Sequence, residues 1–268
     1  MRTPRLAGLG LATFAAAAMT VAGCDNGSTG STPSGGSSAP ATAASSASAA
    51  DPAAVSALSA ATAKLGETSF KISATSGPGF KLTGAVDAAK GVGTADLTAT
   101  GQNAELKVKT LLIDQDLYVQ VPGVTKAGTW THLDVSRLPD GANVGLRPGR
   151  IDPVNTANLL GSATDVHATG GNAYAGTVDL TKAVGLAGVD QVTIDNYGAQ
   201  AQNVPFTVGL DDQGRLSALT ITLPAVNGQQ VQPIEVLYSD YGASVTVTRP
   251  AASEITEAPD SLYGSLGK

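Results

Sequence analysis

The chain has 268 residues, 22 of them acidic and 16 basic, so its formal net charge is −6 at neutral pH. This acidic balance excludes the basic surface that nucleic-acid binding requires. With a single cysteine no disulfide can form within the chain, so an exported domain must be stabilised by its core alone. Aromatic residues make up only 4% of the chain and there are 32 glycines, which predicts a core of small side chains that either packs thinly or leaves room for a ligand.

The first 23 residues have the pattern of a secretory signal peptide. Arg2 and Arg5 precede an apolar stretch, and no acidic residue occurs before position 25. The string Val-Ala-Gly-Cys at residues 21–24 resembles a bacterial lipobox. That resemblance implies cleavage after Gly23 and modification of Cys24 by diacylglycerol and by an N-acyl chain such as palmitate. The alternatives are a cysteine buried in a core and a membrane-spanning anchor of ~18 apolar residues. The polar segment that follows, in place of a basic flank, favours lipidation.

Residues 24–50 are expected to be the lipidated N-terminus and a flexible linker. Residues 25–50 are almost entirely Ser, Gly, Ala, Thr and Pro, which cannot bury enough apolar surface to offset the entropy of ordering. A flexible linker of about 26 residues spans roughly 30 Å. A folded body attached to it would work at a membrane surface and not within the membrane.

The body begins with a helix and continues with strands. Asp51 and Pro52 have the preferences of a helix N-cap and first turn, and the helical spacing of Val55, Leu58, Thr62 and Leu65 predicts a narrow apolar stripe. Alternating apolar and polar residues then predict strands. The expected strands are 70–75, 80–86, 93–100, 104–113, 117–121, 129–134, 164–168, 173–179, 204–211, 215–223, 231–239 and 243–248.

Several segments interrupt this pattern. Residues 138–150 are expected to form a loop, a second Asp-Pro pair at 152–153 predicts the start of a short helix that ends at Gly161, and residues 180–188 predict a short helix or a turn. Residues 190–202 fit no single period. The last two of the expected strands are predicted to pair with each other, and residues 253–268 to form a loosely ordered tail.

The fold class expected is α+β, with a strongly curved antiparallel half-barrel sheet whose concave face is covered by a few short helices. Short sequential strands joined by tight turns indicate a meander. Gly84, Gly93 and Gly209 fall inside expected strands and predict bulges or bends, and hence curvature. Such a sheet, covered by thin helices, tends to enclose a cavity.

Several strings in the body resemble the actinobacterial LppX/LprG lipoprotein family, whose fold is similar to that of the lipoprotein carrier LolA. They are residues 204–219 (VPFTVGLDDQGRLSAL) and 235–250 (EVLYSDYGASVTVTRP), with the earlier pair 116–120 (DLYVQ) and 130–134 (WTHLD). The resemblance implies a lipid-binding domain over residues 51–252. It also implies that the protein binds an acylated lipid or glycolipid in a hydrophobic cavity and moves it across the cell envelope.

The expected cavity wall is formed by apolar positions of the early strands and of the covering helices. The same residues would equally serve as an ordinary core. The candidates are Val55, Leu58, Phe70, Ile72, Phe80, Leu82, Val86, Leu159 and Leu160.

Signatures of catalysis are weak. His132 and His167 have no partner at the spacing of a zinc site, and no Gly-x-Ser-x-Gly elbow occurs. The acidic strings at 114–116 and 211–214 lack the spacing of a calcium loop, so hairpin turns are expected there. Arg147 and Arg150, which flank Pro148-Gly149, are expected to lie in a solvated loop, with a phosphate headgroup as the alternative partner.

The function expected is therefore that of a non-enzymatic carrier of lipid, with no cofactor or metal. It would be monomeric and lipid-anchored on the extracytoplasmic side of the cell membrane. The alternative is a surface lipoprotein that acts as a scaffold or partner-binding module for a membrane transporter.

Overall fold

The computed structural model describes residues 50–101, 105–123, 125–138, 146–147, 150–182, 189, 191–226 and 228–265. The expected signal peptide, the lipidation site Cys24 and nearly all of the expected linker lie outside the described residues. So does most of the expected loop at 138–150.

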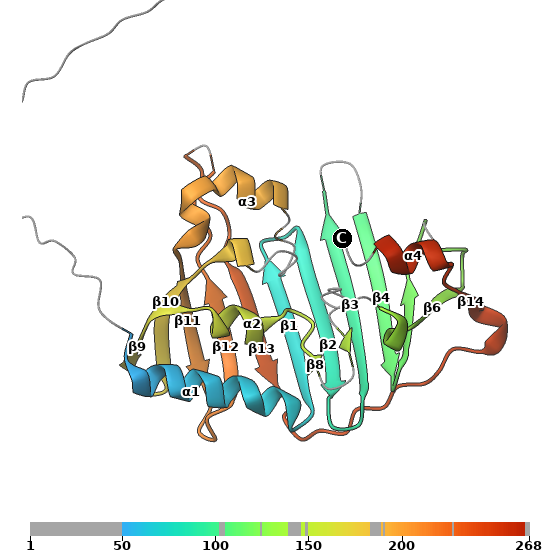
Figure 1. Cartoon of the computed structure of the whole chain (residues 1–268), viewed down its shortest axis with the longest axis horizontal. Coiled ribbons are helices and arrows are strands. Elements are labelled where there is room, and N and C mark those ends of the chain that lie inside the picture. Colours follow the sequence, from blue (N-terminus) through green and yellow to red (C-terminus); the bar gives the residue numbers. More distant parts are fainter. Residues whose placement is uncertain are drawn as a thin grey trace, which may run out of the picture. The chain divides into compact units, whose positions relative to one another are not determined.

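A curled sheet of 12 strands is the framework of the domain (Figure 1). β1–β6 form one antiparallel meander and β9–β13 form a second, and pairing of β1 with β13 joins the two side by side. β14 pairs in parallel with β6 at one edge, and β9 forms the other edge. The strands are β1 (Phe70–Ser76), β2 (Phe80–Asp87), β3 (Val92–Thr100), β4 (Glu105–Ile113), β5 (Asp116–Gln120), β6 (Trp130–Asp134), β9 (Thr164–Gly170), β10 (Ala173–Val178), β11 (Val204–Leu210), β12 (Leu216–Ile221), β13 (Ile234–Ser239) and β14 (Ile255–Glu257).

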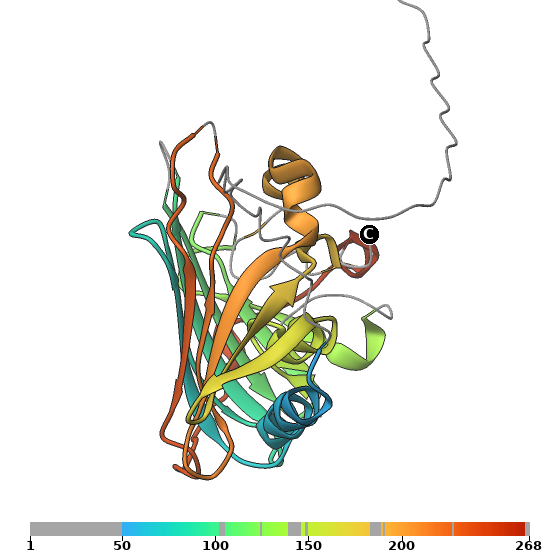
Figure 2. The same ribbon diagram turned by 90° about the vertical axis from the view of Figure 1, so that its left-hand side faces the viewer.

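The helices lie on the same side of this sheet (Figure 2), so the expected α+β class and the open, curled form of the sheet are confirmed. A two-stranded hairpin of β7 (Leu146–Arg147) and β8 (Arg150–Ile151) is separate from the large sheet. The helices are α1 (Pro52–Ala63), α2 (Thr156–Gly161), α3 (Gln191–Tyr197) and α4 (Asp260–Ser265). The 3-10 turns are η1 (Lys64–Gly66), η2 (Val135–Arg137), η3 (Leu180–Lys182), η5 (Gly198–Gln202) and η6 (Ala252–Glu254).

The two faces of the sheet differ in polarity because side chains alternate along each strand. On β1, Phe70, Ile72 and Ala74 are buried, whereas Lys71 and Ser73 point to the other face. The antiparallel register carries this alternation from strand to strand. One face, the inner face, is therefore apolar and packs against helices, and the outer face carries Thr, Ser and Lys.

The glycines expected to mark bulges have two different roles. Gly209 lies at a register shift between β11 and β12, as expected. Gly84 and Gly93 lie in unbroken register, so the expectation of bulges there is wrong. A Cβ at Gly84 would lie 2.6 Å from the carbonyl oxygen of Thr94 on β3, so the close approach of the two strands excludes a side chain. A Cβ at Gly93 would lie 3.5 Å from the Ile151 side chain, because the β7–β8 hairpin packs on the inner face.

The two Asp-Pro pairs behave differently. Asp51 caps α1 as expected, since its carboxylate accepts a hydrogen bond of 2.9 Å from the amide of Ala53. The second helix, α2, begins at Thr156 and not at Asp152-Pro153. Asp152 still accepts a hydrogen bond from the amide of Ala157, so its carboxylate caps the helix across a longer turn.

The C-terminal part of the chain differs most from expectation. Residues 243–248 do not form a strand with β13, because both edges of β13 are already occupied by β1 and β12. The expectation of a loosely ordered tail at 253–268 is also wrong for the described residues of this segment, because they contain η6, β14 and α4. The chain crosses from the middle of the sheet to the β6 edge and adds a strand there (Figure 1).

One apolar core joins the helices to the inner face. α1 contributes Ala54, Leu58 and Ala61, all at most 3% exposed, and the two alanines let the helix backbone approach the residues beneath it closely.

In the described ranges, no helix has both the length and the apolar character needed to cross a membrane.

Candidate functional site

The residues expected to line a cavity mostly meet in the core between the sheet and the helices. They belong to one buried cluster, each at most 9% exposed: Leu58, Phe70, Ile72, Phe80, Leu82, Val86, Leu159 and Leu160. The structure thus brings eight of the nine candidates together. Burial alone does not separate a cavity wall from a packed core, so their role as a lining stays a prediction.

Val55 is the exception. It is 43% exposed and lies on the outer side of α1, so it cannot contribute to an interior wall. The buried stripe of this helix follows Ala54, Leu58, Ala61 and Leu65 in place of the expected positions 55, 58, 62 and 65. The small side chains at 54 and 61 decide the phase, because they allow the helix backbone to approach its neighbours closely.

An apolar strip on the inner face extends beyond this buried core. We define the apolar strip as five side chains on three neighbouring strands: Leu97, Ala99, Leu106, Val108 and Val119. Cross-strand register places Leu97 opposite Val108 and Ala99 opposite Leu106. Leu97 also lies opposite Leu82 of the buried cluster, so the strip is continuous with the core on the same face.

The strip becomes more exposed along the strands. Val86, Leu112 and Leu117 lie at one end of the inner face and are at most 1% exposed. At the other end Leu106 is 45% exposed, and Leu97, Ala99, Val108 and Val119 are only partly buried. Apolar side chains therefore continue, through Leu82 and Leu97, from the buried core to solvent at the end of β3, β4 and β5.

The strip is a surface that an apolar partner would shield from water. Each square ångström of apolar area in contact with water costs about 25 cal/mol, so an acyl chain laid along the strip would remove water from both partners. No bond needs to form or break. The next inner-face residue along β4 after Val108 is Thr110, which carries a hydroxyl group.

Two grooves elsewhere in the described part of the chain are open and uncharged. One, of about 680 Å³, lies along the outer side of α1 and includes Val55. The second, of about 480 Å³, lies between η5 and the segment that follows β12, and Leu223 lines it. Neither groove is lined by a candidate residue other than Val55.

A polar group lies inside the core where α2 begins. The hydroxyl oxygens of Thr156 and Tyr238 are 2.5 Å apart, and both residues are buried. Asp152 lies close by, and burial raises its pKa to about 6 although the amides of Ala157 and Val154 donate hydrogen bonds to it. Burial also raises the pKa of Tyr238, and the charge of Asp152 adds to that effect.

The raised pKa of Asp152 predicts a pH-dependent stability. The folded protein holds this proton more tightly than the unfolded chain, so the stabilisation is complete below about pH 4 and is lost as pH rises through about 6. Because Asp152 keeps some exposure, we expect a loss of about 1–3 kcal/mol in the free energy of unfolding.

Denaturant unfolding at a series of pH values from 4 to 7.5 measures this effect. Asp152→Asn should reduce the fall in stability across this range, whereas Asp212→Asn, at an exposed turn position, should leave it unchanged. An unaltered slope in the Asp152→Asn variant contradicts the assignment.

The residues considered for catalysis or metal binding have structural partners. Asp211 accepts hydrogen bonds from the amides of Gln213 and Arg215 and pairs with the Arg215 guanidinium at 2.6 Å, so this acidic string forms the expected hairpin turn. His167 contacts the backbone oxygen of Asp165. Within the part of the chain that the structure describes, no group of three or more His, Cys, Asp or Glu side chains is arranged to hold a metal ion. The side chains of Arg147 and Arg150 lie outside the described residues.

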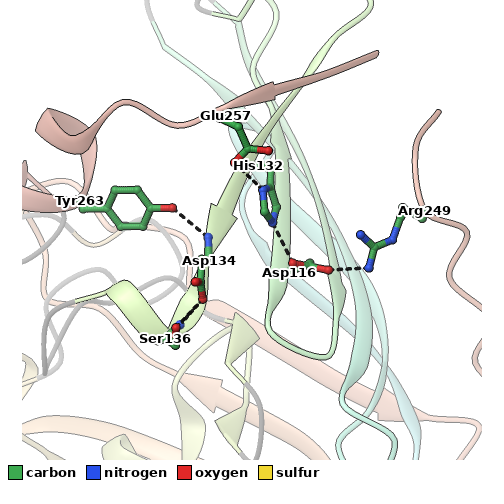
Figure 3. Close-up of polar contacts among 7 residues, drawn as sticks. All are labelled: Asp116, His132, Asp134, Ser136, Arg249, Glu257 and Tyr263. Atoms are coloured by element: carbon green, nitrogen blue, oxygen red, sulfur yellow. Dashed lines mark hydrogen bonds and ion pairs between the residues drawn. The ribbon is translucent and has the colours of Figure 1, made fainter. Parts of the chain in front are cut away.

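Sequence reasoning missed two sets of residues. The apolar strip was contained in expected strands, and the alternation of residues 97–99 and 106–108 was the signal that marked it. The second set surrounds His132, which contacts Asp116 and Glu257 (Figure 3). Glu257 belongs to the expected C-terminal tail. Only the parallel pairing of β14 with β6, which the sequence does not indicate, places Glu257 beside His132.

Neither the family models nor the curated proteins compared with this chain gave a match.

Proposed function

We propose that this chain is a membrane-anchored lipoprotein of the cell envelope, similar to the LppX/LprG family, with a LolA-like half-barrel that binds a lipid or glycolipid on its inner face. It would carry or present that lipid across the envelope without chemical conversion. The protein would be an extracytoplasmic monomer held by its N-terminal lipid, and a membrane transporter would be a partner of the loaded form.

The observation that carries this proposal is the apolar strip. Leu97, Val108 and Leu106 continue the core of the domain outward until the last of them is 45% exposed. A contiguous apolar surface that reaches solvent is typical of a site for an apolar partner. Its place on the inner face of a curled sheet, beside covering helices, suits an elongated acyl chain.

The anchor supports the same function. The residues that precede Cys24 resemble a lipobox, and the residues after it have the composition of a flexible tether. Two or three acyl chains hold a protein at a bilayer, whereas one binds reversibly. A tethered body would stay within reach of membrane lipids and could still turn its inner face toward them.

Native mass spectrometry of the full chain, purified from membranes in mild detergent, tests the proposal. We expect a non-covalent lipid mass in addition to the covalent anchor. Comparison with Cys24→Ala separates the two, because that variant lacks the anchor and keeps the inner face. A chain that never retains a lipid, even after incubation with total membrane extract, contradicts the proposal.

Cys24→Ala also tests the anchor by itself. We expect the variant to remain an uncleaved precursor without incorporated fatty acid, because diacylglycerol transfer needs the Cys24 thiol. Metabolic labelling with radioactive palmitate and intact-mass measurement give the result. Processing after Gly23 together with label in the variant would show that the anchor was assigned to the wrong residue.

A further inference from the structure

The C-terminal segment is fastened to the β6 edge of the sheet around one histidine. β14 pairs in parallel with β6, with Glu257 opposite His132. The amide of Ala258 donates a hydrogen bond of 2.9 Å to the backbone oxygen of His132. Both the backbone and the side chain of His132 therefore hold this segment.

The His132 ring lies between two carboxylates (Figure 3). Its Nδ1 is 2.8 Å from Oε2 of Glu257, and its Nε2 is 2.9 Å from Oδ1 of Asp116. Carboxylates accept hydrogen bonds, so each ring nitrogen must donate one, and only the doubly protonated imidazolium can do so. A neutral ring would leave a lone pair facing one carboxylate.

The groups around this ring balance its charge. On β5, Asp116 also binds the Arg249 guanidinium at 2.5 Å, and the buried Tyr118 ring stacks on His132 with centroids 5.1 Å apart. Asp134 lies two residues away on the same face of β6. Two cations, His132 and Arg249, thus contact the acidic groups of β5 and β14, and Asp134 of β6 lies nearby.

Burial lowers the pKa of His132, but the hydrogen bonds that its ring donates to Glu257 and Asp116 outweigh burial, and the net effect raises the pKa. For Asp116, burial acts to raise the pKa, and the hydrogen bonds from His132 and Arg249 reverse this and lower it. Both shifts favour the charged forms of the pair.

Beyond β14, the segment covers part of the core. Tyr263 of α4 is 7% exposed and Ala258 is 8% exposed, and both belong to the buried cluster. The hydroxyl of Tyr263 accepts a hydrogen bond of 2.9 Å from the amide of Asp134. Arg137 lies 4.2 Å from the centre of the Tyr263 ring and pairs with Asp260 at 2.6 Å. Displacing β14 and α4 would uncover the apolar side chains beneath them.

We propose that β14 and α4 form a pH-sensitive lid on the β6 edge of the core, locked when the imidazolium of His132 bridges Asp116 and Glu257. The lock holds where His132 is charged and both carboxylates are ionised. Because docking raises the pKa of His132, the lid is held most tightly below the pKa of the undocked ring and loosens as pH rises through that of the docked ring. At acidic pH, below the ordinary range of an aspartate because the pKa of Asp116 is lowered, protonation of Asp116 also weakens the lock. This inference is independent of what the inner face binds.

Two measurements on the full chain in detergent micelles test the lid. The chain has only two histidines, so NMR of selectively labelled histidine resolves both, and His167→Gln assigns them. We expect His132 to titrate above the ordinary histidine value of about 6.5. Glu257→Gln, at a side chain that is 74% exposed, should lower that pKa without affecting folding.

Hydrogen exchange of the Ala258 amide measures docking directly. Its protection factor, corrected for the intrinsic pH dependence of exchange, should fall between pH 5.5 and 8.5 by about tenfold for each unit by which the pKa of His132 exceeds 6.5. His132→Gln should abolish this fall, and His167→Gln should leave it unchanged. A protection factor independent of pH, or a pKa of His132 at or below the ordinary value, overturns the proposal.

Discussion

Replacing Leu97 with aspartate is expected to abolish lipid binding while the domain remains folded. Leu97 is a partly buried member of the apolar strip, between Leu82 on β2 and Val108 on β4. A carboxylate there would have to lose its hydration when an acyl chain covers it, at a cost of several kcal/mol. Because the side chain is partly exposed in the free protein, the substitution costs far less in folding than in binding.

The matched control is the next residue along β3. Thr98 is also partly exposed but points to the outer face, opposite Lys107. Thr98→Asp introduces the same charge one position away, so it should retain the lipid mass seen by native mass spectrometry. Equal loss in both variants would mean that charge on β3, and not the inner face, decides binding.

Replacing Phe206 with alanine is expected to destabilise the domain by about 3–5 kcal/mol. Phe206 of β11 is 1% exposed, and its ring lies over Gly176 of β10, where an added Cβ would be 2.9 Å from the ring. The glycine has no side chain with which to fill the space that the ring would leave. A loss of this size is a large part of the 5–15 kcal/mol by which typical domains are stable.

Urea unfolding followed by circular dichroism measures this loss. Thr207→Ala, the neighbouring and exposed position on the same strand, is the control and should change the free energy of unfolding by less than about 0.5 kcal/mol. A loss below about 1 kcal/mol for Phe206→Ala would mean that Phe206 is not a packed part of the core.

Local sequence patterns predicted most of the strands, because alternation reports which face of a strand is buried. The residues from Phe70 to Val86 and from Val204 to Ile221 form strands close to their expected bounds. Alternation does not predict which strands pair when they are far apart in the sequence. Alternation cannot reveal that β1 pairs with β13, which leaves no edge for residues 243–248.

Short apolar stripes and caps were harder to place. The phase of α1 depends on Ala54 and Ala61, whose small size matters only against the surface on which they pack. Asp152 has the preferences of a helix cap, but an additional turn separates it from the start of α2. The lock around His132 joins the adjacent strands β5 and β6 to Glu257, which is 125 residues further along the chain and lies in a stretch without an apolar period.

The position of the bound lipid tests the central claim most directly. A lipid that carries a photoreactive diazirine midway along an acyl chain can be loaded onto the full chain, crosslinked by light and located by peptide mass spectrometry. The apolar strip predicts labels on β3, β4 and β5, at or beside Leu97, Val108 and Val119. Labels confined to the outer groove of α1 or to the groove beside Leu223, with none on these strands, would contradict it.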